Sequence, residues 1–136
     1  MTTTPAATGI PAYTESLPCK TASARPARLL VSTALHVWDL GALVEDAELV
    51  VTELVANSAR HSKCRLLRVT ISRLSGDRVR VAVIDRSNAL PQPRAAGETD
   101  EGGRGLVVVE ALSDRWGTDM LRWGKRVWAE LASPDR

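Results

Sequence analysis

Two stretches in the first half of the chain repeat apolar residues at the spacing of an α-helix. The first, over 24–38, follows Ser23 and carries Pro26 in its first turn, and both residue types are typical of helix starts. Its apolar series is Ala27, Leu30, Val31, Ala34, Leu35 and Trp38. The second runs over about 45–61 and opens with two acidic residues, whose charge complements the helix dipole. The pattern therefore predicts two successive amphipathic helices.

The second helix carries three polar residues, four positions apart, on or beside its apolar face. They are Glu53, Asn57 and His61, and residues at this spacing lie on one side of a helix. A polar group on a buried face costs about 1–3 kcal/mol unless it is paired. The pattern predicts a polar partner or a ligand against this face. The alternative is that Glu53 and Asn57 lie at the solvent boundary of the helix.

The next part of the chain alternates apolar and polar residues and predicts a β-hairpin. Its arms are 67–71 and 79–83, and a Ser-Gly-Asp turn joins them. Asp85 has the same parity as the valines of the second arm, so its carboxylate is expected on the apolar face. There it could accept from the amino group of a base; the alternative is an aspartate that caps the following turn.

A long loop, a short helix and a second hairpin complete the pattern. The loop spans 86–102, and loops of this length are usually functional or disordered. The glycines that flank Arg104, at the end of this loop, would allow backbone N–H groups to approach a phosphate. The alternative is that this segment is a flexible hinge. The remaining elements are a helix over 106–112, a stop at Trp116-Gly117, and hairpin arms at 118–123 and 126–131. This order predicts an α+β two-layer sandwich with the helices on one side.

Composition bounds the possible functions. The length of 136 residues suits one domain, assigned to 16–133, after a flexible tail over 1–15 that ends in a short strand near 13–17. The net charge of +2 gives no support for a nucleic-acid partner. No apolar run reaches the ~18 residues of a membrane span, and no secretory signal is present. We therefore expect a cytoplasmic protein with reduced thiols at Cys19 and Cys64.

Several other residues favour structural roles. Lys125 and Arg126 are expected at a solvated hairpin end, and His61 at the end of its helix, where it complements the dipole. The tryptophans are expected in core and edge packing; they are Trp38, Trp116, Trp123 and Trp128.

The order and spacing of four segments resemble the N, G1 and G2 boxes of the Bergerat ATP-binding fold. The segments are Glu-Leu-Val-x-Asn-Ser-x-Arg-His at 53–61, Val-x-Val-Ile-Asp at 81–85, Gly-Arg-Gly-Leu-x-x-Val-x-x-Leu-x-Asp-x-Trp-Gly at 103–117 and Gly-Lys-x-Val-Trp at 124–128. Over roughly 17–132 the chain is similar to the stand-alone anti-sigma-factor-type serine/threonine kinases of bacteria. The resemblance implies an α+β sandwich with a mixed, mostly antiparallel sheet and three helices on one face.

The resemblance also implies a role for each motif residue. Asn57 would bind the Mg²⁺ ion that bridges the phosphates of ATP, and Glu53 would be the general base for the attacking hydroxyl. Asp85 would bind the adenine amino group. The loop 86–102 would be the ATP lid. The residues expected to wrap the phosphates are Gly103, Arg104, Gly105 and Leu106.

In such kinases the phosphate acceptor is a serine of a small antagonist protein, and the unphosphorylated antagonist releases a captured sigma factor. The implied partners are thus ATP, a sigma factor and its anti-sigma-factor antagonist, together with a second copy of the chain, because relatives often form homodimers. The alternatives are a catalytically inactive, nucleotide-gated binding module and a scaffold with a vestigial pocket.

Two positions depart from the family pattern. The family continues Asp-x-Gly-x-Gly after its aspartate, whereas Asp85 is followed by Arg86-Ser87-Asn88-Ala89. Many relatives carry a threonine that helps to bind adenine through water at the position of Lys125. The departures concern the lid and the base, while the helix residues expected to carry the chemistry are intact.

Overall fold

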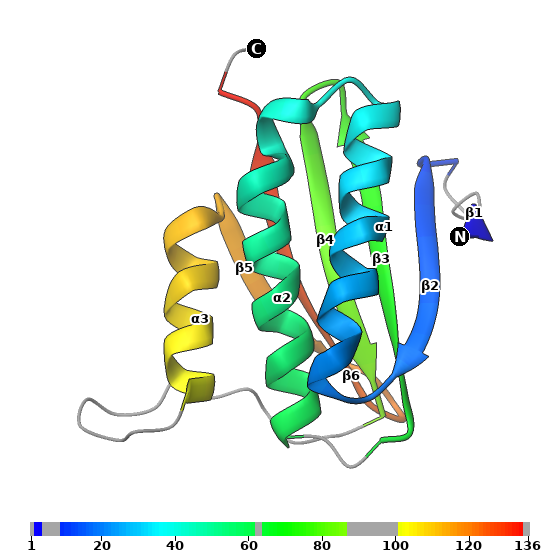
Figure 1. Cartoon of the computed structure of the whole chain (residues 1–136), viewed down its shortest axis with the longest axis vertical. Helices are drawn as coiled ribbons and strands as arrows, with labels where there is room; N and C mark the ends of the chain where they lie inside the picture. Colours follow the sequence, from blue (N-terminus) through cyan, green and yellow to red (C-terminus); the bar gives the residue numbers. More distant parts are fainter. Residues whose placement is uncertain (1, 4–8, 62–63, 87–100, 135–136) are drawn as a thin grey trace.

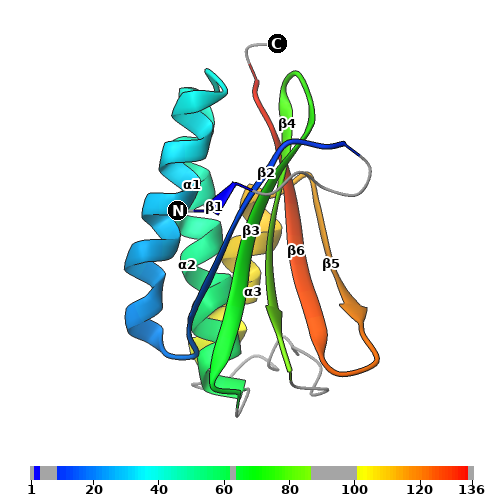
Figure 2. The ribbon, with the colours of Figure 1, turned by 90° about the vertical axis from the view of Figure 1, so that its right-hand side faces the viewer.

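The computed structural model describes residues 2–3, 9–61, 64–86 and 101–134, with backbone alone at 2–3 and 101–105. It forms two layers, a twisted sheet covered on one face by helices (Figures 1 and 2). The helices are α1 (Ala24–Val37), α2 (Val44–His61) and α3 (Glu101–Leu112). The strands are β1 (Thr2–Thr3), β2 (Ala12–Pro18), β3 (Leu66–Ser75), β4 (Arg78–Asp85), β5 (Arg115–Met120) and β6 (Lys125–Ala132). The expected α+β sandwich is confirmed.

The sheet has the strand order β1-β2-β3-β4-β6-β5, and every pairing among the described residues is antiparallel. A mixed, mostly antiparallel sheet was expected. The difference arises because β6 lies between β4 and β5. These two strands run in the same direction, but each pairs with β6 and neither pairs with the other.

The core lies between the sheet and the helices, and α2 lies between α1 and α3 (Figure 1). The apolar series expected for the first helix is buried, and so is the alternating face of the two central strands. The core has no phenylalanine and is built largely from leucine, valine and alanine. Helix α2 packs against β4 across this core, and Ser58 near its C-terminal end hydrogen-bonds Asp85 at the end of β4.

Three boundaries differ from those expected. The short strand expected near 13–17 is β2; it starts at Ala12, so residues 12–15 pair with β3 and do not belong to the flexible tail. Helix α3 starts at Glu101, before the glycines that were expected to precede it. Glycine costs about 1 kcal/mol relative to alanine inside a helix, and burial of Leu106 and Val109 offsets this.

The third difference concerns Trp116 and Gly117, which lie inside β5 and do not end the preceding helix. That helix already ends at Leu112. Gly117 pairs with Trp128 of β6, and a Cβ atom at Gly117 would lie 3.0 Å from the indole ring. A glycine within this strand therefore makes room for an aromatic side chain on its neighbour.

The face of the sheet away from the helices carries charged and aromatic side chains. The Arg80 guanidinium lies 4.4 Å from the centre of the Trp128 ring and 2.6 Å from the buried Glu130 carboxylate. Trp123 is 51% exposed and contacts Arg86 through its ring. Core packing was therefore the wrong expectation for Trp123, and Trp128 packs against arginines on this open face.

Candidate functional site

Four chain segments that are distant in sequence meet at one end of the sandwich. Helix α2 ends there, α3 begins there, β4 ends there and β6 begins there (Figure 1). All four predicted motif segments contribute to this end. The helix pattern and the strand alternation therefore converge on one place, as the resemblance implied.

Helix α2 forms the wall of the candidate site. Asn57 is 2% exposed, and its Nδ2 atom has no hydrogen-bond partner among the described residues. Glu53 lies one turn earlier and is half-buried. The solvent-boundary alternative is thus wrong for Asn57, whose amide donates to nothing within the described part of the chain.

The end of the sheet forms the floor of the site. Asp85 and Lys125 lie directly opposite each other on β4 and β6, on the face that packs against the helices. Lys125 Nζ lies 3.1 Å from Asp85 Oδ1, and both side chains are 0% exposed. Ser58 of α2 donates its hydroxyl to Asp85 Oδ2 at 2.7 Å. Each carboxylate oxygen of Asp85 therefore already accepts a hydrogen bond from the protein.

The close approach of β6 to β4 requires a glycine next to Lys125. A Cβ atom at Gly124 would lie 2.0 Å from the backbone oxygen of Asp85, which no side chain can tolerate. This contact brings the start of β6 against the end of β4. It is the local reason why Lys125 can enter the interior.

The expectation of a solvated Lys125 is wrong. The sequence places it beside a turn, which usually leaves a lysine in water. The register of β4 and β6 instead sets it opposite a buried carboxylate, and this pairing offsets the cost of burying its charge. Arg126, the next residue, points to the other face and pairs with Asp119 at 2.8 Å.

The glycine-rich segment lies in the first turns of α3. Gly103, Arg104 and Gly105 are helical, and Leu106 is buried at 2% exposure. The first N–H groups of a helix have no intrahelical acceptor and carry positive potential, which favours an anion. The backbone of this segment is therefore compatible with a phosphate, although it is helix and not loop. The expected lid falls mainly on residues 87–100, outside the described part of the chain.

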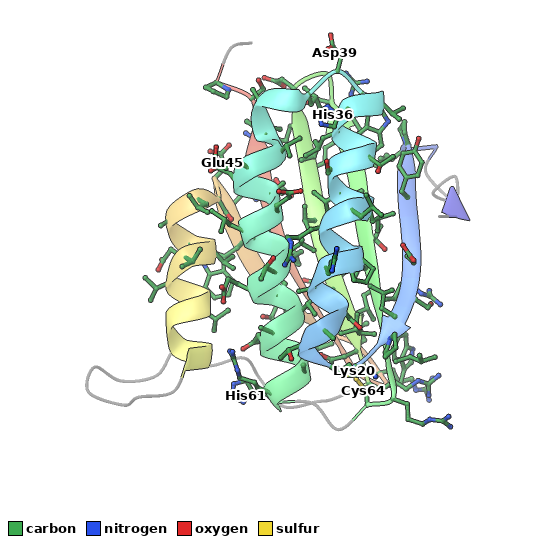
Figure 3. All side chains as sticks on the ribbon, viewed as in Figure 1. Lys20, His36, Asp39, Glu45, His61 and Cys64 are labelled. Atoms are coloured by element: carbon green, nitrogen blue, oxygen red, sulfur yellow. The ribbon has the colours of Figure 1, made fainter. Side chains whose placement is uncertain are left out.

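His61 is the last residue of α2, as expected, and lies at the same end as the start of α3 (Figure 3). Reasoning from the sequence missed the roles of Ser58 and Lys125. A signal for Ser58 existed, because it lies one residue after Asn57 on the same buried helix face. Lys125 had no comparable local signal, since its burial depends on a strand partner forty residues away.

The donor set of the wall suits a magnesium ion bound together with phosphates. Mg²⁺ prefers neutral or charged oxygen ligands and usually takes only one or two from the protein. The Asn57 side chain offers one amide oxygen, and its buried Nδ2 needs an acceptor such as a phosphate oxygen. On this ground the residues present fit a metal–nucleotide ligand.

The family model for the histidine kinase-like ATPase domain matches residues 17–129. Since this match spans most of the chain, the chain belongs to the histidine kinase-like ATPase family. No curated protein matches it. The match covers α1 to most of β6 and so includes every motif residue discussed above.

Solved structures support the same fold. The chain is similar to the crystal structure of the RsbU and RsbW domains of Rv1364c from Mycobacterium tuberculosis, with a TM-score of 0.64 and 21% identity over 90% of this chain and 32% of that one. It is also similar to the histidine kinase domain of the blue-light activated histidine kinase of Erythrobacter litoralis EL346, with a TM-score of 0.51 and 17% identity over 86% of this chain and 62% of that one. The chain thus spans about a third of the first protein and under two thirds of the second. Within the described residues, no helix is long and apolar enough to cross a membrane.

Proposed function

We propose that the chain binds ATP with Mg²⁺ and acts as an anti-sigma-factor-type serine/threonine protein kinase. Its substrate would be a serine of a small antagonist protein, and its action would control transcription through a sigma factor by partner switching in the cytoplasm. The observation that carries the proposal is the buried Asn57 amide, whose Nδ2 has no described partner, on the helix that also presents Glu53. Family membership supports nucleotide binding.

The residues divide the work of phosphoryl transfer. Asn57 would hold the ion, which supplies charge neutralisation on the phosphates. Glu53 would accept the proton of the attacking serine hydroxyl, and a half-buried carboxylate on a rigid helix suits that role. The backbone at the start of α3 would bind phosphate oxygens.

Two measurements test the proposal. Calorimetric titration with ATP and Mg²⁺ should give binding that Asn57→Ala weakens by about tenfold or more, because hydrogen bonds to charged groups contribute about 1.5–3 kcal/mol. Labelled ATP should transfer phosphate to an antagonist protein. Glu53→Gln should lower that transfer by about 10²–10⁴-fold with binding retained. Glu45→Gln, at the far end of the same helix (Figure 3), is the matched control.

A second candidate is a nucleotide-gated binding module without catalysis. The satisfied Asp85 carboxylate favours it, because the floor of the site is already complete without a ligand. This candidate gives ATP-dependent capture of a partner and no phosphate transfer in the same assay. Absence of ATP binding would overturn both candidates.

A further inference from the structure

The floor of the site contains a donor surplus that the proposed function does not use. Lys125 is fully buried, and in the described part of the chain its ammonium donates to Asp85 alone. An ammonium has three N–H donors. A ligand that enters this end therefore meets several donors and one carboxylate that is already engaged.

The ion pair is expected to persist when a ligand binds. Removal of one member would leave a buried charge uncompensated, which costs far more than a neutral hydrogen bond returns. A base must therefore add to the Asp85–Lys125 pair and cannot replace it. The edge offered to the base consists of a carboxylate acceptor beside an ammonium donor.

Purine bases differ at the edge that would meet this pair. Adenine presents a 6-amino donor, which would share Asp85 with Lys125 and Ser58, and an N1 acceptor, which can take one of the remaining Lys125 donors. Guanine and hypoxanthine present a 6-oxo acceptor, which can take one of the remaining Lys125 donors while their N1–H donates to the carboxylate. A lone carboxylate would repel the 6-oxo group, and the ammonium removes that repulsion.

We infer that Lys125 is a specificity-determining residue that makes the site accept 6-oxopurine nucleotides as well as adenine nucleotides. The inference rests on the proposed nucleotide binding and extends it to the base. It is carried by the Asp85–Lys125 contact, the burial of both side chains and the hydroxyl of Ser58 on the other carboxylate oxygen.

The test compares ATP, GTP and ITP, each with Mg²⁺, by calorimetry on the full chain. The three dissociation constants should agree within about threefold, because each base finds a matching set of donors and acceptors. ITP isolates the 6-oxo contact, since it lacks the 2-amino group of guanine. If ATP binds at least about tenfold more tightly than GTP and ITP, the inference is overturned and the proposed function stands. Absence of binding by all three would overturn the proposed function and the inference with it.

A variant locates the effect. Lys125→Thr removes the ammonium and should restore a preference for ATP of about tenfold or more over GTP. Lys20→Met, which removes an exposed lysine, is the control and should leave the ratio unchanged. If Lys125→Thr does not fold, as judged by circular dichroism, the three-nucleotide series on the wild-type chain still decides the question. An unchanged ratio in folded Lys125→Thr would contradict the role of Lys125.

A separate observation concerns the two cysteines, which are present as thiols. Cys19 follows β2, and Cys64 precedes β3, next to Lys20 in Figure 3. Their Sγ atoms lie 2.6 Å apart, both residues are half-buried, and the backbone N–H of Cys19 donates to Arg65. The backbone therefore already holds the two segments together.

We further infer that this pair is a site of reversible oxidation. A small disulfide such as oxidised glutathione would accept two electrons and two protons from the thiols and leave as two reduced thiols, while the Sγ–Sγ bond forms. Treatment of the wild-type chain should remove both titratable thiols, lower the mass by two hydrogen atoms and leave a monomeric band on a non-reducing gel. Cys64→Ser should form no internal bridge. Persistence of both thiols in the wild-type chain, or a glutathione adduct in place of the bridge, would overturn this inference.

Discussion

The wall and the floor of the candidate site solve the problem of buried polar groups in opposite ways. On the wall, Asn57 keeps an amide donor with no partner among the described residues. On the floor, Asp85 has a protein donor on each carboxylate oxygen. A buried group without a partner costs about 1–3 kcal/mol, so the wall is the part that a ligand would stabilise. On the floor, Asp85 is satisfied by hydrogen bonds without a ligand, so this part of the site contributes mainly to the stability of the fold.

The largest expected change in stability follows from substitution of Lys125 on the floor. Lys125→Met leaves the Asp85 carboxylate buried without its counter-charge and should lower the free energy of unfolding by about 3–5 kcal/mol. Urea denaturation measures this change. The double variant Asp85→Asn/Lys125→Met should recover much of the loss, because no buried charge remains. A loss below about 1 kcal/mol in the single variant would show that the floor is not held by this pair.

The contact that admits Lys125 to the floor can be tested separately. Gly124→Ala places a methyl group against the backbone of Asp85 and should cost about 3 kcal/mol of stability, at the upper end of overpacking effects. Gly76→Ala is the matched control, since nothing lies within 4 Å of its Cβ position. Thermal melts that show equal stability for the two variants would contradict the close approach.

The wall should respond in binding more than in stability. Asn57→Ala removes an amide whose nitrogen has no described partner, so its free energy of unfolding should change by less than about 1 kcal/mol. ATP affinity should fall by about tenfold or more. A large loss of stability with unchanged affinity would reverse the contrast between wall and floor.

The smallest effect is expected at the exposed neighbour of the floor pair. Asp119 lies opposite Arg126 on the open face, and hydrogen bonds from that guanidinium hold the pKa of Asp119 below its usual range. A lowered folded-state pKa stabilises the fold above the unfolded pKa of about 3.9, and this contribution is lost as the pH falls through the folded value. Both side chains are more than a third exposed, so Asp119→Asn should cost under about 1 kcal/mol at pH 7 and less at pH 2. Denaturation at the two pH values checks this.

Much of the fold follows from periodicity, because both long helices and the strands β3, β4 and β6 bury one face. Asn57 and Asp85 were found in the same way, as polar residues at apolar positions. The errors share a different cause. Trp116 and Gly117 resemble a helix stop until β6 is placed opposite them, and Lys125 resembles a surface residue until β6 pairs with β4. Both depend on pairings between distant segments, which local pattern does not contain.

The Asp85–Lys125 pair also bears on how β4 and β6 find their alignment. A slip of two residues between β4 and β6 keeps every side chain on its own face, so the apolar pattern alone does not exclude it. Such a slip would set Asp85 opposite Val127, or Lys125 opposite Val83, and would bury two unmatched charges. Asp85 and Lys125 therefore favour one register of β4 against β6 over the others that the apolar pattern permits.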